Sequence, residues 1–556
     1  MKGRAGGFAM KPLSLILILL LLLSLSASHA ATPEAAQKFL RGYRHSWCPY
    51  ALPAETTLDE ILKVADLGFD TVGVSFVGPY NGGNIDFSKL DEAVDAVGKR
   101  GQKVVIHVAP RFSDGDGISD RLDNGTLIRH AWNRSPNYAI LDIFDPRQRR
   151  KFCDWVRLCA KRYGRDERVA AFVIGWGYMG ETGFYNGDFL ADFSKQGSEC
   201  AGCSPYALAE FNRWRREMNL PPVSELPLPS TGGQSDDYIL FHRFRCEFVR
   251  NVFHREMIAA AKSETDYPVG TFAYISACSD SYARNWVDSP NADFYRSAGS
   301  ASSFDMTRTL IDSGIGWEDA WLHDSDWKFT AAEMERDEAR QIARGAVFHA
   351  MWVRVYDTEP QWEKGIFGRV ASFLKTQNLE KSIRRPKPTV ALYQPTWGAA
   401  AFPSRSESQK FLPKLEYMLY TTKMIGLVES FGLPYRLITE ADLLDSPRLK
   451  EFRHIILPMW DLMPRIIGGS RFESLAKDRR VVRVPLKERP LTRSEFRELL
   501  KESGVQTWLD FDSDGILAGR YANVVYNWDD KPIRVRVPEQ EDEIELSPHG
   551  YTVLPK

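Results

Sequence analysis

Residues 169–183 read VAAFVIGWGYMGETG, an apolar run followed by a lone carboxylate, Glu181, between two glycines. A short apolar run bounded by glycine is typical of a buried parallel strand, and such folds place their chemistry at the carboxyl ends of the strands. The rings of Trp176 and Tyr178 beside this carboxylate suit a sugar, whose C–H faces stack on aromatic rings while its hydroxyls bind fixed polar groups. The alternative is a strand-to-loop junction whose glutamate is simply solvated.

The amino-terminal segment has the parts of a signal peptide. The basic residues Lys2, Arg4 and Lys11 precede an apolar block, Leu13–Leu23, that is too short to span a bilayer. Small residues follow it, and we predict cleavage after Ala30. The mature protein is therefore expected to be exported, to the periplasm or beyond the cell. No later segment is apolar enough to predict a membrane span.

Length and charge narrow the class of protein. A chain of 556 residues is too long for one ordinary core and favours two to three domains. Its 72 basic and 73 acidic residues are interspersed, which gives no electrostatic footprint for nucleic acid. Seven cysteines leave at least one unpaired. Cys200 and Cys203 form the only close pair, which indicates either a small disulfide loop or half of a zinc site; we favour a structural role.

Apolar runs alternate with amphipathic stretches from residue 31 to residue 385, and this alternation predicts a (β/α)8 TIM barrel. The expected strands are Leu40–Trp47, Thr71–Val77, Lys103–Ala109, Val169–Gly175, Val269–Tyr274, Ala292–Tyr295, Ile315–Trp317 and Ala346–Val355. The expected helices include Leu58–Asp66, Leu90–Arg100, Gln148–Tyr163, Ala207–Met218, Tyr238–Ser263 and Ala331–Ala343.

Two further domains are expected after the charged, proline-bearing linker Lys381–Lys387. Residues 386–503 alternate strands and helices in an order that predicts a doubly wound, flavodoxin-like α/β domain. This region lacks a glycine-rich phosphate loop, so no nucleotide is assigned to it. Residues 504–556 hold short strands separated by turn residues, which predicts a small β-sandwich-like domain.

A barrel that cleaves glycosidic bonds needs two carboxylates that flank the scissile bond, about 5–5.5 Å apart if configuration is retained. Glu181 ends the fourth expected strand, and Glu318 ends the seventh. We expect Glu181 to be the acid/base, in the more apolar setting, and Glu318 to be the nucleophile. Asp319 is the alternative carboxylate, with Glu318 turned into the wall. Glu318 could also be merely an acidic residue at a helix start.

Several segments together resemble glycoside hydrolase family 42, the clan-A barrel enzymes best known as β-galactosidases. The resemblance covers nearly the whole mature chain. The matching segments are Leu67–Val72, Asp86–Asp91, Val173–Gly183, Phe211–Trp214 and Gly345–Trp352. The resemblance implies that Glu181 is the acid/base and that Trp352 is a ring at the floor of the sugar site. It also implies a trimerisation domain after the barrel, a C-terminal β domain and therefore a possible homotrimer.

Three departures from that family concern the site. Gly180 stands where the family has an asparagine that binds the sugar 2-hydroxyl, which leaves open a different 2-position, a substitute residue or an inactive site. Gly73 stands where the second strand usually carries an arginine, and Arg44, Arg111 or Arg354 could replace it. The family's zinc cluster has more cysteines than Cys200 and Cys203 offer, so no metal is assigned.

Further candidates for substrate binding lie near the expected strand ends. His107, flanked by apolar residues, could equally be a hydrogen-bonded core histidine, and Trp176 and Trp317 could equally be barrel packing. The full set of predicted substrate-binding residues is Arg44, His45, Trp47, His107, Arg111, Trp176, Tyr178, Trp286, Trp317, Trp321 and Trp352.

Two functions follow from these patterns. The first is an exported retaining glycoside hydrolase that acts on a β-linked oligosaccharide or polysaccharide and needs no cofactor. The second is a catalytically inactive carbohydrate-binding protein on the same barrel, because a fold does not by itself imply an activity. The geometry of the two carboxylates discriminates between them.

Overall fold

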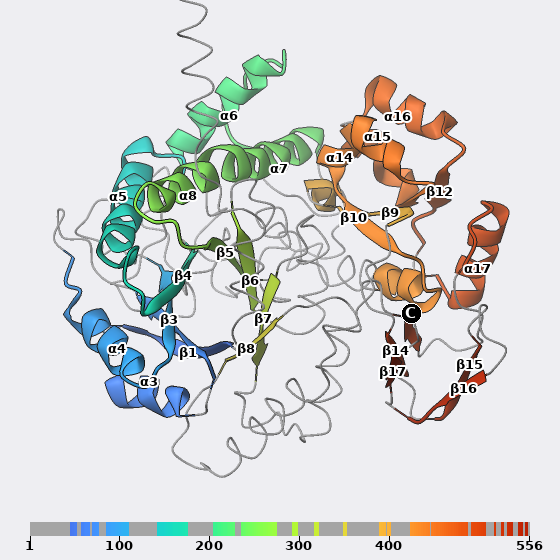
Figure 1. The fold of residues 1–556 in the computed structure, drawn as a ribbon. Coiled ribbons are helices and arrows are strands. Elements are labelled where there is room, and N and C mark those ends of the chain that lie inside the picture. Colours follow the sequence, from blue (N-terminus) through green and yellow to red (C-terminus); the bar gives the residue numbers. More distant parts are fainter. Residues whose placement is uncertain are drawn as a thin grey trace, which may run out of the picture.

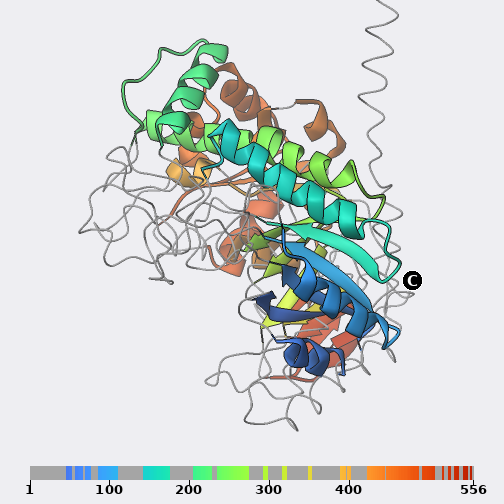
Figure 2. The ribbon, with the colours of Figure 1, turned by 90° about the vertical axis from the view of Figure 1, so that its left-hand side faces the viewer.

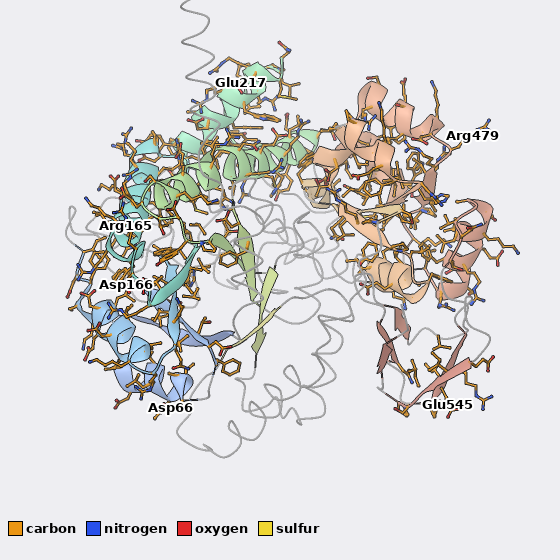
Figure 3. The ribbon with its side chains drawn as sticks, viewed as in Figure 1. Asp66, Arg165, Asp166, Glu217, Arg479 and Glu545 are labelled. Atoms are coloured by element: carbon orange, nitrogen blue, oxygen red, sulfur yellow. The ribbon has the colours of Figure 1, made fainter. Side chains whose placement is uncertain are left out.

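The computed structural model describes the following parts of the chain: residues 45–52, 57–66, 69–76, 85–109, 142–175, 204–227, 235–274, 292–298, 316–321, 348–352, 388–395, 397–401, 423–444, 446–487, 491–507, 516–518, 524–527, 531–536, 543–548 and 551–553. Figure 1 shows these elements coloured along the sequence, and Figure 3 shows their side chains filling the space between strands and helices. Within the described residues, no helix is both long enough and apolar enough to cross a bilayer. The predicted leader lies outside them.

Eight parallel strands form a closed barrel in sequence order, which confirms the predicted barrel. The strands are β1 (His45–Leu52), β2 (Thr71–Phe76), β3 (Lys103–Val108), β4 (Val169–Ile174), β5 (Val269–Tyr274), β6 (Phe294–Ala298), β7 (Gly316–Trp321) and β8 (Phe348–Trp352). Strand β1 pairs with both β2 and β8 and so closes the ring.

Helices cover the outside of the barrel (Figures 1 and 2). The described ones are α3 (Leu58–Ala65), α4 (Ser88–Gly98), α5 (Pro146–Tyr163), α6 (Pro205–Glu217), α7 (Asp236–Phe248), the π-helical η4 (Val249–Phe253) and α8 (His254–Lys262). The sequence predicted one helix over Tyr238–Ser263, and the structure interrupts it with the π-turn. The predicted helix Ala331–Ala343 lies outside the described residues.

Side chains on the strands alternate between two apolar environments. On β2, Val72, Val74 and Phe76 belong to the core packed against the helices, and the Phe76 ring stacks on Trp155 of α5 at 5.6 Å between centroids. Because successive residues of a strand point to opposite faces, Ser75 lies on the face that lines the barrel interior. This alternation decides which residues can reach a site inside the barrel.

The first strand differs from its prediction, because β1 runs from His45 to Leu52 rather than ending at Trp47. His45 and Trp47 therefore lie in the first half of the strand, not at its carboxyl end. The register of β1 against β2 shifts between Cys48 and Ala51 and then continues. Pro49, which lacks an N–H donor, lies in this irregular stretch.

The later strands are also displaced from their predictions. Strand β7 extends to Trp321, so Glu318 lies inside the strand and not at its end. Strand β6 extends to Ala298, beyond the predicted end at Tyr295. In both cases the apolar run stops before the strand does, because pairing with the neighbouring strands continues through polar residues.

A second sheet of four parallel strands follows the barrel, in the order β10-β9-β11-β12. In chain order this is 2-1-3-4, the order found in flavodoxin-like sheets. Its strands are β9 (Val390–Tyr393), β10 (Tyr435–Ile438), β11 (His454–Pro458) and β12 (Val481–Val484). Its helices are η6 (Trp397–Ala401), residues 423–430, α14 (Glu440–Leu444), η8 (Ser446–Glu451), η9 (Trp460–Leu462), α15 (Met463–Ile466), α16 (Gly469–Lys477) and α17 (Arg493–Glu502).

Two small antiparallel sheets complete the described chain. One contains β13 (Ile516–Ala518), β14 (Val524–Asn527) and β17 (Tyr551–Val553), and the other contains β15 (Ile533–Arg536) and β16 (Glu543–Leu546). Strand β13 was not predicted. The domain boundaries at 385 and 503 stay predictions.

Candidate active site

A hydrogen-bonded pair lies inside the barrel near the carboxyl ends of two strands. Ser75 Oγ lies 3.0 Å from His107 Nδ1, and both residues are next to last in their strands. The His107 ring is fully buried. Of the two interpretations that the sequence left open, this geometry favours a hydrogen-bonded core histidine, whose ring orientation the serine fixes.

The backbone register extends this interior face across the barrel. In a parallel ladder, directly paired residues share a face, and so do residues two apart on one strand. Gly73 therefore shares the face of Ser75. Gly73 pairs with Trp47, Trp47 pairs with Trp352, and Trp352 pairs with Trp321. The register thus brings three of the predicted tryptophans to one level on adjacent strands.

The same register separates the two acidic residues of β7. Trp317, Asp319 and Trp321 are two residues apart and share one face of β7, and Glu318 lies on the other. The register therefore assigns Asp319, rather than Glu318, to the interior face. Which of the two acidic residues acts in the chemistry stays a prediction.

A second route around the barrel leads to the same face. From His107 the pairing passes to Val173 on β4, to Gly270 on β5 and to Phe294 on β6. Arg296, two residues beyond Phe294, shares this face and pairs with Trp317. Arg296 is a basic candidate that the sequence analysis missed, because the predicted sixth strand ended at Tyr295. Its position inside a strand was visible only from pairing.

The remaining predicted residues lie outside the described chain. These are Arg44, Arg111, Trp176, Tyr178, Glu181 and Trp286. The segment that carries Glu181 leaves the barrel after β4, where the Gly175 N–H donates to the Val108 carbonyl at 3.1 Å. It returns at Ser204, the N-cap of α6. The pairing of Cys200 with Cys203 also lies outside the described residues.

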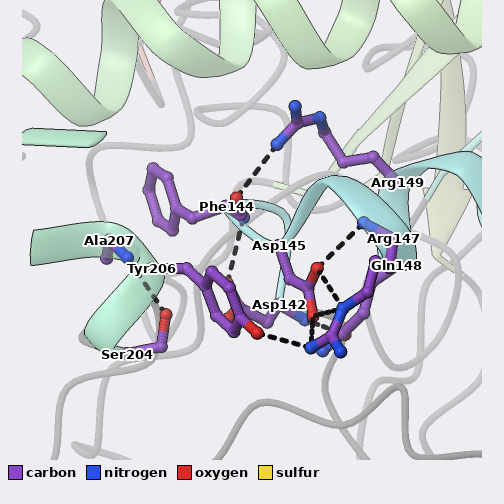
Figure 4. A network of polar contacts seen from close by, with 9 residues as sticks. All are labelled: Asp142, Phe144, Asp145, Arg147, Gln148, Arg149, Ser204, Tyr206 and Ala207. Carbon is purple, nitrogen blue, oxygen red and sulfur yellow. Dashed lines mark hydrogen bonds and ion pairs between the residues drawn. The ribbon is translucent and has the colours of Figure 1, made fainter. Parts of the chain in front are cut away.

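Ser204 caps α6, as Figure 4 shows, and also contacts Asp142, just before α5. Its side chain accepts a hydrogen bond from the Ala207 N–H at 3.1 Å and is itself hydrogen-bonded to the Asp142 carboxylate. Asp142 comes just before α5, so this contact joins the returning ends of the segments that follow β3 and β4. Burial raises the pKa of Asp142 to about 6, against hydrogen bonds from Ser204 and the Phe144 N–H.

Cys153, Cys159 and Cys246 are buried thiols. Burial raises the pKa of the Cys153 thiol to about 12, which makes it a poor nucleophile at neutral pH. Within the described ranges, no group of three or more His, Cys, Asp or Glu side chains is arranged to hold a metal ion.

The comparison with solved structures identifies the fold. A β-galactosidase from Rahnella sp. R3 matches with a TM-score of 0.61 at 12% identity, over 92% of this chain and 98% of its own. A β-galactosidase from Halorubrum lacusprofundi matches with a TM-score of 0.60 at 14% identity, over 92% of this chain and 99% of its own. The fold is that of glycoside hydrolase family 42.

A match with a lower TM-score is to an enzyme that is not described as a β-galactosidase. The exo-carrageenase GH42 from Bacteroides ovatus has a TM-score of 0.51 at 11% identity, over 86% of this chain and 78% of its own. No protein-family model and no curated protein sequence matches the chain. The low identities mean that the GH42-type likeness is one of fold, and the activity must be argued from the site.

Proposed function

We propose that this protein is an exported glycoside hydrolase that cleaves a β-linked oligosaccharide or polysaccharide with retention of configuration. The observation that carries the proposal is the GH42-type fold, shared over about nine-tenths of the chain with β-galactosidases. A retaining hydrolase needs two carboxylates. The sequence has Glu181 in the segment that follows β4, and Glu318 and Asp319 on β7.

In the proposed reaction, Glu181 donates its proton to the glycosidic oxygen as the bond to the anomeric carbon breaks. A carboxylate of β7 attacks that carbon and forms a glycosyl-enzyme ester. Glu181 then removes a proton from water, which attacks the same carbon and releases the sugar and the free carboxylate. Glu318 and Asp319 are the two candidates for the nucleophile, and the register favours Asp319.

The substrate is proposed to differ from that of ordinary β-galactosidases. Gly180 offers no amide to a sugar 2-hydroxyl, so either the 2-position differs or another residue binds it. Gly73 leaves the nucleophile without an arginine on β2, and Arg296 on the interior face of β6 is a substitute in addition to Arg44, Arg111 and Arg354. The leader and the domain after the barrel lead us to propose an exported protein that assembles as a homotrimer.

The test is hydrolysis of a panel of aryl β-galactosides, mannosides, glucosides and arabinosides, together with plant and algal oligosaccharides. We expect the native protein to cleave one class. Glu181→Gln should lower kcat by at least about a thousandfold for substrates with poor leaving groups, because proton donation is lost. Of Glu318→Gln and Asp319→Asn, only the variant that lacks the nucleophile should lose turnover to a similar extent.

Small external nucleophiles separate the two roles. Azide should restore product formation in the acid/base variant with retained configuration, and in the nucleophile variant with inverted configuration. If the native protein cleaves no member of the panel but still binds glycans, the hydrolase proposal fails and the carbohydrate-binding alternative replaces it.

A further inference from the structure

An exposed aromatic ring lies beside an exposed arginine at the amino-terminal ends of α5 and α6. Tyr206 is 40% exposed and, with Met218, is one of two large exposed apolar side chains among the described residues. The guanidinium carbon of Arg147 lies 5.4 Å from the centre of its ring. Met218 follows the opposite end of α6, so the ring at Tyr206 is a separate feature.

A buried carboxylate fixes the orientation of this arginine (Figure 4). Arg147 Nε donates to Asp145 Oδ1 at 3.1 Å, and Arg147 Nη2 donates to Asp145 Oδ2 at 2.8 Å. The Arg147 side chain is 65% exposed, whereas that of Asp145 is 1% exposed. Arg147 Nη2 also donates to the Tyr206 hydroxyl. The cation and the ring are therefore held together before any ligand arrives, which lowers the entropy lost on binding.

The exposed charge around this pair is positive. Arg147 and Arg150 are exposed and three residues apart, hence on one face of α5, and the next acid on that face, Asp154, is paired with Arg157. The amino-terminal end of a helix adds a partial positive charge. The nearby acids Asp142 and Asp145 are buried. A ligand that contacts this surface therefore meets cations and a ring.

The position links this surface to the proposed active site. Helices α5 and α6 begin where the chain returns from the carboxyl ends of β3 and β4, the end of a barrel that carries its chemistry. The second of these returning segments carries Glu181.

We propose that Tyr206, Arg147 and Arg150 form a distal subsite for a glycan residue that bears an anionic group. The sugar face stacks on the Tyr206 ring, and the two arginines bind the oxygens of a carboxylate or sulfate substituent. This proposal rests on the proposed glycoside hydrolase function and specifies its substrate class as acidic β-linked glycans.

The test measures binding to the full-length protein by calorimetry, in the Glu181→Gln background so that the probes stay intact. The probes are the β-1,4-linked tetramannuronate, a sulfated carrageenan tetrasaccharide and the neutral β-1,4-galactotetraose. We expect one charged probe to bind more tightly than the neutral one, and its identity separates carboxylate from sulfate. Arg147→Gln and Tyr206→Ala should each weaken that probe by about tenfold, and Arg150→Gln by about threefold.

Arg216→Gln, the same charge change at an exposed position near the other end of α6, is the matched control and should change nothing. Tyr206→Ala and Arg150→Gln alter exposed side chains, so they test the subsite even if Arg147→Gln disturbs folding around Asp145. Equal binding of charged and neutral probes overturns the proposal, as does equal weakening by Arg216→Gln. Failure of the hydrolase proposal would appear separately, as absent cleavage of the glycoside panel.

Discussion

Asp142 is a buried carboxyl at the start of α5 whose pKa is raised to about 6, first of all by burial. Its ionised form is therefore less stable in the folded protein than in the unfolded chain, where the pKa is near 3.8. Ionisation of Asp142 therefore lowers the free energy of unfolding. This loss is absent below pH 4, grows as the pH rises from 4 to 6, and is complete above pH 6.

Asp142→Asn should remove this loss while its side-chain oxygen still accepts from the Phe144 N–H. We expect the variant to gain stability relative to the native protein by roughly 3 kcal/mol at pH 7.5 and by almost nothing at pH 4. Thermal unfolding at both pH values measures this. Asp86→Asn is the control, because the pKa of that carboxyl is lowered by hydrogen bonds from Ser88 and the variant should show no such gain. A gain of equal size at both pH values would contradict the interpretation.

At the scale of elements, β5 and β6 approach closely because a glycine faces a phenylalanine ring. Gly270 pairs with Phe294, and a Cβ on Gly270 would lie 2.7 Å from the ring atom Cε2. Phe294 is 1% exposed, so the ring has little room to move. The absence of a side chain at residue 270 thus allows the large ring to fill the barrel interior.

Gly270→Ala should lower the free energy of unfolding by about 1–3 kcal/mol, since overpacking forces the ring or backbone to shift. Phe294→Leu in the same chain should recover part of this loss. Gly426→Ala is the matched control: it lies in the helix at residues 423–430, no atom lies within 4 Å of the added Cβ, and it should raise stability by up to about 1 kcal/mol. Denaturant unfolding checks all three, and equal effects at both glycines would refute the packing argument.

At the scale of the whole molecule, α7 joins the barrel to the four-stranded sheet. The Arg243 guanidinium lies 5.6 Å from the Trp214 ring of α6 and 5.4 Å from the Trp397 ring of η6. Glu247 accepts from Arg243 Nε at 2.8 Å and from Trp214 Nε1 at 2.8 Å. The guanidinium is thus stacked against rings from both parts of the molecule, with its charge paired.

Arg243→Ala should loosen the contact of η6 with α7, because it removes a stacked, partly buried cation from between two rings. We expect calorimetry to resolve two unfolding transitions, or a single one lowered by several degrees. Arg465→Ala is the comparison: its ion pair with Asp236 also joins the two parts but is exposed, so its loss should cost less than about 1 kcal/mol. Identical thermograms for the two variants would exclude a special role for Arg243.

The sequence by itself determined the alternation of strands and helices that makes the barrel and the parallel order of the second sheet. These follow from apolar periodicity and from residues such as Gly175, which are local signals. It also predicted an acidic residue after the fourth strand and another at the end of the seventh. The resemblance carried by Val173–Gly183 pointed to the fold that the solved structures share.

Only the tertiary structure decided where β1, β6 and β7 end, since a strand continues as long as its neighbours supply N–H and C=O partners from distant parts of the chain. For the same reason it alone assigned Asp319 and Arg296 to the interior face. The burial of Asp142 and the pairing of Arg147 with Tyr206 also depend on segments far apart in sequence. Local patterns determine which elements form, and contacts between distant elements determine which side chains face a site.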